Sequence, residues 1–323
     1  MNQVVQSVII VTPIIFVLAL GFFAGKFHSF GKNNDTIPII NDLVLNFALP
    51  ASLFVGTVTV SRSALEKDLV LFFALLIALL LGYGIGFCTA KLIFKRNIVE
   101  SAIAALGVAF SAGPFYGPAL LGGIYGADKG GVAISLISLV LNVVIVPLTT
   151  IIIKIELERK SGQHDSISKL IGSSVFQAIF KTPFVWAPLL GFVFVFIGLS
   201  MPTVVLSSLK LIGQATAGVA VFVAGMTIAA NKFTVTGEVV TLTLLKNIAL
   251  PLIFFGIALM LQMSQGTTMF NQGLLLAALP SGPMIVLLST RYKQYQKEAS
   301  SILALSTVGM LITVTALIMV LHL

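Results

Sequence analysis

Long apolar runs dominate this sequence and limit what the chain can fold into. A bilayer core about 30 Å thick is crossed by about 20 helical residues, because a helix rises about 1.5 Å per residue. Ten runs of roughly that length lie between charged or Gly/Pro-rich breaks. The predicted spans are residues 4–25, 37–60, 69–94, 101–125, 131–155, 183–199, 211–230, 239–263, 273–290 and 301–321.

The composition excludes a soluble globule. Hydrophobic residues make up 58% of the chain and charged residues only 9%, whereas soluble domains carry about 25% charged residues. A soluble protein of this size would need a charged outer shell that these residues cannot supply. We therefore expect an all-α integral membrane protein with ten transmembrane helices.

The basic residues predict an orientation. Of the 19 lysines and arginines, Arg62, Lys67, Lys129 and Lys210 fall in even-numbered connections, and the other 15 fall nearest to odd-numbered ones. Cytoplasmic loops carry the excess of basic residues, so the odd-numbered connections are expected in the cytoplasm and both termini outside a multi-pass cell membrane protein. This asymmetry explains the net charge of +8 better than nucleic-acid binding does.

The two halves of the chain are weakly similar. At an offset of 168 to 170 residues, Ser111-Ala112-Gly113-Pro114 falls on Pro280-Ser281-Gly282-Pro283, and Asn46 falls on Gln214. Residues 1–155 are then one five-helix repeat, residues 182–323 the second, and residues 156–181 a cytoplasmic linker. Because each half holds an odd number of spans, the second enters the membrane from the opposite side, which predicts inverted repeats.

Prolines and glycines interrupt the fourth and ninth spans at matching places. Gly113-Pro114, Gly117-Pro118, Pro280 and Gly282-Pro283 break helical hydrogen bonding. Backbone groups freed inside a membrane are tolerated only where they line protein or a cavity. The alternative for each span alone is a simple proline kink. For the matched pair we predict broken helices that cross near the membrane centre, where their N-termini carry partial positive charge that favours an anion.

Charged residues within the spans are few. Asp42, Glu100, Asp128, Glu238 and Glu298 lie near predicted span ends, whereas cation and proton carriers usually place a carboxylate inside the membrane. An anionic or neutral substrate is therefore favoured. Lys246, in the predicted eighth span, is interpreted as an interfacial lysine whose side chain reaches the bilayer surface.

These features together resemble the auxin efflux carrier family, in its short prokaryotic branch of malate permease-like and malonate transporter-like proteins. The resemblance spans the chain and rests on the ten-span layout, the central loop, Asn46-x-x-x-Pro50, the two Gly-Pro breaks and the stretch from Tyr292-Lys293 to Glu298-Ala299-Ser300. It implies a scaffold of spans 1, 2, 6 and 7, a mobile transport unit of spans 3–5 and 8–10, and often a homodimer formed through the scaffold.

The resemblance also implies a carboxylate-bearing substrate bound where spans 4 and 9 cross. The plant carriers usually have an asparagine beside the break in span 4, where this chain has Ser111 and Gly113, and this chain lacks their long loop. Both departures favour a small metabolic acid, such as malate or malonate, over auxin. The candidate substrate-binding residues are Ser111, Gly113, Pro114, Tyr116, Ser281, Gly282, Pro283, Asn46 and Gln214.

Some of the candidate binding residues also have a simpler structural interpretation. Either serine alone is as readily a packing residue between membrane helices, and interhelical hydrogen bonding is slightly favoured over substrate contact for Asn46.

The predicted function is secondary transport of small organic anions by alternating access, with an elevator-like transport unit and no cofactor or metal. The alternative is a sodium-coupled symporter of the bile-acid type. Coupling to protons or sodium, exchange and uniport all stay open.

An enzyme is the least favoured class. The three histidines, His28, His164 and His322, lie in loops or at the chain end, and the sequence has no His-Glu-x-x-His motif and no paired intramembrane aspartates. Cys88 alone cannot build a disulfide framework.

Overall fold

The structure is a computed structural model that describes residues 3–59, 62–126, 130–161, 176, 183–230 and 234–323, and it is helical throughout. Most of the predicted linker, residues 162–175 and 177–182, lies outside the described residues. The elements of the first half are α1 (Gln3–Lys26), α2 (Asn33–Leu43), η1 (Val44–Ala48), α3 (Leu49–Val58), α4 (Arg62–Cys88), η2 (Thr89–Ile93), α5 (Ile98–Ala109), α6 (Gly113–Tyr125), α7 (Gly131–Leu139), η3 (Val140–Ile145) and α8 (Val146–Ser161). Those of the second half are α10 (Pro183–Ile197), α11 (Thr203–Gly213), α12 (Ala215–Ala230), α13 (Gly237–Leu244), η4 (Leu245–Ala249), α14 (Leu250–Met260), α15 (Thr268–Ala278), α16 (Met284–Tyr292) and α17 (Gln296–Val320).

Within the described residues, six helical stretches are long and apolar enough to cross a membrane. They are Asp35–Val58, Leu69–Ile93, Gly131–Arg159, Thr203–Ala230, Gly237–Met260 and Gln296–Val320. Shorter apolar helices cover Thr12–Lys26, Ile98–Ala109 and Trp186–Ile197. The class of all-helical membrane protein is therefore confirmed, and each of the ten predicted segments is helical over most of its length.

Two predicted spans are each split into a pair of helices. The fourth is divided between α5 and α6, and the ninth between α15 and α16. The breaks fall at residues 110–112 and 279–283, next to the Gly-Pro pairs that predicted them. Elsewhere the predicted boundaries differ by several residues. At the centre of the chain, α8 continues to Ser161, which is six residues into the predicted linker, so this part of the linker is helical.

Three further prolines lie inside continuous helices. Pro50, Pro147 and Pro251 each follow within two residues of a π-helical segment, namely η1, η3 and η4. Proline lacks a backbone N–H and its ring clashes with the carbonyl one turn earlier. A wider π turn before the proline relieves this clash without ending the helix, and such turns are frequent at functional sites.

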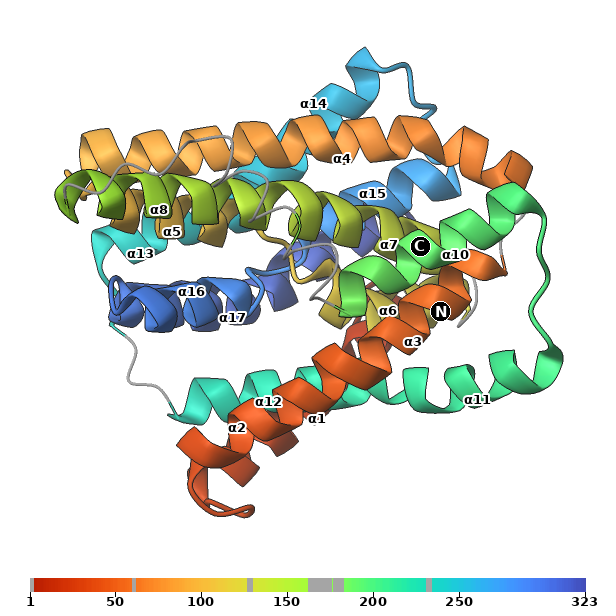
Figure 1. Cartoon of the computed structure of the whole chain (residues 1–323), viewed down its shortest axis with the longest axis horizontal. Coiled ribbons are helices and arrows are strands. Elements are labelled where there is room, and N and C mark those ends of the chain that lie inside the picture. Colours follow the sequence, from red (N-terminus) through yellow and green to blue (C-terminus); the bar gives the residue numbers. More distant parts are fainter. Residues whose placement is uncertain (1–2, 60–61, 127–129, 162–175, 177–182, 231–233) are drawn as a thin grey trace.

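Helix contacts can be sorted into two sets of helices, which also pack on each other, α3 on α7 and α12 on α6. We call α1–α3 with α10–α12 the flanking group, in which α1 packs on α12 and α3 packs on α10 and α11. We call α4–α8 with α13–α17 the crossing group, in which α4 packs on α5 and α14, and α13 packs on α17. Figure 1 shows α4 and α8 in the upper part of the view and the line of α11 and α12 in the lower part.

Close helix contact within the flanking group depends on glycine. A Cβ added to Gly225 of α12 would collide with the backbone oxygen of Leu18 and approach the backbone nitrogen of Phe22, both in α1, the latter to 2.7 Å. Gly218, two turns earlier on α12, has no atom within 4 Å of an added Cβ. Small residues let membrane helices approach this closely.

These two glycines form a matched pair for a stability test. Gly225→Ala should destabilise the protein by about 1–3 kcal/mol, because α1 and α12 must move apart. Gly218→Ala should leave the unfolding temperature close to that of the wild type. Thermal unfolding of both variants in detergent, followed by size-exclusion chromatography, measures the difference. Equal unfolding temperatures would contradict the close packing of α1 on α12.

Candidate functional site

The two helix breaks meet at their backbones. Ser111 and Ser281 form an isolated antiparallel β-bridge. The N–H of Ala112 donates to the Pro280 carbonyl at 2.8 Å, and the N–H of Gly282 donates to the Phe110 carbonyl at 2.9 Å. Segments 170 residues apart thus satisfy each other's unpaired backbone groups, as a buried non-helical backbone requires.

Helices begin and end on both sides of this bridge. Immediately before it, α5 and α15 end at Ala109 and Ala278, and immediately after it, α6 and α16 begin at Gly113 and Met284. The first N–H groups of each new helix lack intrahelical acceptors and carry partial positive charge. The bridge therefore brings two half-helix N-termini and two half-helix C-termini into one region, which we call the crossing.

The predicted glycines allow the close approach at the crossing. A Cβ on Gly282 would come within 2.5 Å of the Phe110 ring, and one on Gly113 within 2.9 Å of the Ile137 side chain. Pro114 lies in the first turn of α6, and Pro283 caps the start of α16. Neither proline sacrifices an intrahelical hydrogen bond there, because the N–H groups of a first turn have no partner in the helix.

Side chains from other elements donate hydrogen bonds to backbone carbonyls at the C-terminal end of α15. The Ser111 hydroxyl donates to the Leu276 carbonyl at 2.5 Å, and the Lys246 ammonium donates to the Ala277 carbonyl at 3.0 Å. The interpretation of Lys246 as an interfacial lysine is wrong, because its side chain is completely buried. Lys246 lies in the π-helical segment η4, and its ammonium contacts α15 instead of extending out of the protein.

The other predicted residues of the crossing are buried as well, apart from the half-buried Pro283. The Ser281 hydroxyl has no hydrogen-bond partner among the described residues, and the buried Tyr116 hydroxyl lies near Thr307. The Ser281 N–H donates to the Ser306 hydroxyl at 3.1 Å, and the Asn247 amide donates to the Ser306 carbonyl at 2.9 Å. The sequence analysis did not single out Ser306, which lies in a run that carries no break.

Asn46 and Gln214 do not belong to this cluster. Both are exposed and lie in the flanking group, Asn46 in η1 and Gln214 at the end of α11. Gln214 instead lines a cleft of about 680 Å³ between α3, α11 and α12 on one side and α6 and α7 on the other. Ser52, Thr59, Ser207 and Lys210 supply other polar groups of the cleft, and Pro118 of α6 lies on its opposite wall.

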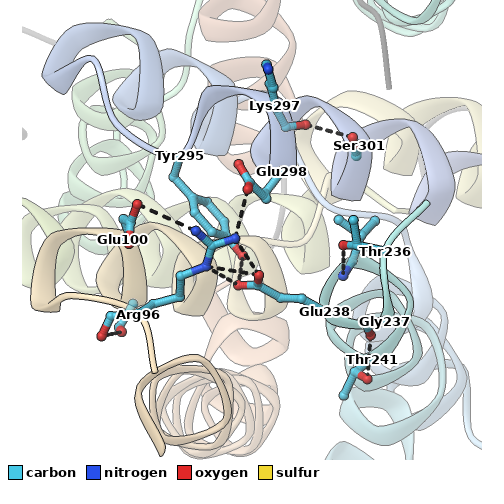
Figure 2. A network of polar contacts seen from close by, with 12 residues as sticks. Arg96, Glu100, Thr236, Gly237, Glu238, Thr241, Tyr295, Lys297, Glu298 and Ser301 are labelled. Carbon is cyan, nitrogen blue, oxygen red and sulfur yellow. Dashed lines mark hydrogen bonds and ion pairs between the residues drawn. The ribbon is translucent and has the colours of Figure 1, made fainter. Parts of the chain in front are cut away.

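A second polar cluster holds one end of the crossing group together (Figure 2). The Arg96 guanidinium, just before α5, binds the Glu238 carboxylate at 2.7–3.2 Å and the Glu298 carboxylate at 2.8 Å. Glu100 lies at 3.7 Å from it, and the guanidinium carbon stacks 5.2 Å from the centre of the Tyr295 ring. One arginine thus joins the starts of α5, α13 and α17.

Tyr295 completes this cluster from a strained backbone. Its φ is +61°, which a bulky residue adopts only where the surroundings require it, and its hydroxyl donates to Glu238 at 2.5 Å. Burial above all, and then the hydrogen bond to Glu238, raise the pKa of the hydroxyl above its ordinary value, so the tyrosine keeps the proton that it donates. Glu238 and Glu298 were noted in the sequence only as span-end acids, because pairing between distant loops leaves no local pattern.

Comparison with known proteins agrees with this architecture. Residues 6–318 match the model of a family described as membrane transport protein. The chain is also 31% identical, over 304 residues and 93% of both chains, to the uncharacterized transporter YfdV of Escherichia coli K12, and equally to YfdV of Escherichia coli O157:H7 and of Shigella flexneri. The family is one of transporters, so the exclusion of an enzyme is confirmed. The chain belongs to the membrane transport protein family, which is that of the auxin efflux carriers.

Proposed function

We propose that this transporter is a secondary carrier of small organic anions, such as malate or malonate, which bind at the crossing. The observation that carries the proposal is the backbone bridge between Ser111 and Ser281, because it brings the N-termini of α6 and α16 together. Helix N-termini bind anions through their unpaired N–H groups and their dipoles. The unpartnered hydroxyl of Ser281, together with the hydroxyl of Tyr116, would replace part of the water shell of a carboxylate.

The two helix groups suggest how the substrate would move. In this proposal the crossing group is the transport unit, the flanking group is the scaffold, and two inverted five-helix repeats generate both. The groups touch through several helix pairs, among them α12 with α6 and α1 with α17. At one of these contacts Gly56 of α3 faces Gly131 of α7, with an added Cβ on either glycine within 3 Å of the other's backbone. A contact made of two backbones has few interlocking side chains, which supports sliding of one group along the other. Dimerisation through the scaffold is part of the same proposal.

The proposal is tested with purified protein in liposomes. Uptake of labelled malate or malonate above that of protein-free liposomes is expected, with competition from unlabelled carboxylates. Failure of folded protein to transport any carboxylate in a broad panel would refute the proposal. A strict requirement for sodium would favour the sodium-coupled alternative.

The proposed orientation makes a separate prediction. With both termini outside, the cleft beside Ser207 opens to the exterior, and the Arg96 cluster faces the cytoplasm. In a Cys88→Ala background, Ser207→Cys should react with a membrane-impermeant maleimide in intact cells, because Ser207 is exposed in the cleft. Lys297→Cys, which is also exposed, should react only after permeabilisation. The reverse pattern would invert the proposed topology.

A further inference from the structure

We propose that Lys246 is a tethered cation that takes the place of a coupling metal ion and supplies the positive charge for the bound anion. This inference rests on the proposed function and states which group balances the negative charge of the bound anion. It assigns the charge balance of the site to a side chain of the crossing group instead of a sodium ion from solution.

The surroundings of Lys246 are those of an isolated charge. Its relative exposure is 0%, and its ammonium donates to one acceptor, the Ala277 carbonyl, at 3.0 Å. Among the residues that the structure describes, no carboxylate forms an ion pair with it. Buried charges are ordinarily paired, because removing an ion from water without a counter-charge is unfavourable. An anionic ligand would supply the missing counter-charge.

Capping of a helix end does not explain why an ionisable residue stands at this position. The neighbouring carbonyl, that of Leu276, is capped by the neutral hydroxyl of Ser111. A neutral donor thus performs the same task one residue away, at the same end of α15, and burying it is less unfavourable than burying an ammonium. The presence of a lysine where a neutral donor would suffice therefore calls for a role beyond the hydrogen bond.

The position of Lys246 corresponds to that of a coupling ion. In secondary transporters, the carbonyls at the C-terminal ends of broken helices coordinate sodium, while the N-terminal ends bind the anionic substrate. Ala277 is at the C-terminal end of the broken helix α15, and the Pro280 carbonyl, three residues on, is in the bridge itself. An ammonium that donates to Ala277 thus uses the kind of ligand that a sodium ion would use.

The inference is tested with three variants that separate charge from hydrogen bonding. Lys246→Gln keeps a donor for the Ala277 carbonyl and removes the charge, whereas Lys246→Met removes both. Thr243→Val is the matched control, because Thr243 lies one turn earlier on the same helix, and its buried hydroxyl has no partner among the described residues. Folding is checked by size-exclusion chromatography and thermal unfolding, and binding of malate and malonate by calorimetry in sodium and in choline buffer.

We expect wild-type protein and Thr243→Val to bind the dicarboxylates equally well in sodium and in choline. Lys246→Gln and Lys246→Met should both bind at least about tenfold more weakly, because a factor of ten is only about 1.4 kcal/mol of lost attraction. Binding by Lys246→Gln within threefold of wild type, or sodium-dependent binding by wild type, would overturn the inference alone. Absence of carboxylate binding and transport in folded wild-type protein would overturn the proposed function and this inference with it.

Discussion

Replacing Arg96 by methionine should lower the free energy of unfolding by about 3 kcal/mol, as expected when one partner of a buried ion pair is removed. Methionine keeps much of the packing of the arginine stem, so the loss reports on the charge. The Glu238 side chain is only 7% exposed, and without Arg96 it would be a buried carboxylate facing Glu298. Thermal unfolding in detergent measures the effect, with uptake in liposomes as a second readout.

A matched control is available on the surface. Arg159 lies 4.0 Å from Glu156, and its side chain is 75% exposed. The Glu156 side chain is only 9% exposed, but the arginine end of the pair is in solvent and the 4.0 Å separation is long for an ion pair. Contacts of such solvent-exposed charges contribute little, so Arg159→Met should unfold closer to the wild-type temperature than Arg96→Met. If both arginine variants unfold alike, the Arg96 cluster does not stabilise the crossing group.

A second substitution separates charge from lost contacts. In the Arg96→Met background, Glu238→Gln removes the uncompensated carboxylate while it keeps an acceptor for the Tyr295 hydroxyl. We expect this double variant to recover a substantial part of the lost stability, because much of the cost of the single change is the unpaired buried charge. A double variant that is less stable than Arg96→Met would show that packing dominates.

The sequence predicted the crossing because its signals are local. Proline and glycine determine where a helix stops regardless of what lies around it, so the breaks around Pro114 and Pro283 could be located without coordinates. Which polar groups meet there depends on tertiary packing. Lys246 shows this difference: an isolated lysine in an apolar run is compatible with extension to the surface, and only the packing of η4 on α15 buries it.

The pairing of residues far apart in the chain likewise could not be predicted from the sequence. Arg96 and Glu298 are 202 residues apart, and no spacing rule connects them. Asn46 and Gln214 illustrate a second point, and their part in substrate binding stays a prediction. They match each other in the two halves of the sequence, but both lie in the flanking group, exposed and away from the bridge. Matching positions in two copies of a unit identify equivalent places, and these need not be adjacent.

Substitution of Gly282 by alanine should reduce transport at least about tenfold. The new Cβ would lie 2.5 Å from the ring of Phe110, which is itself only 1% exposed and has no room to withdraw. Overpacking of this kind costs about 1–3 kcal/mol, and 1.4 kcal/mol already reduces the population of the correctly formed crossing tenfold. Because the Gly282 N–H donates to Phe110, the displacement acts directly on the bridge.

The matched control is Gly256→Ala in α14, where an added Cβ has no atom within 4 Å. This variant should transport at the wild-type rate. Initial uptake rates in liposomes, normalised to the amount of folded protein, compare the two. The Gly282→Ala variant is still expected to fold, since the extensive helix packing of the crossing group does not depend on two bridge hydrogen bonds. Undiminished uptake by Gly282→Ala would mean that the substrate passes elsewhere, with the cleft lined by Gln214 and Lys210 as the alternative route.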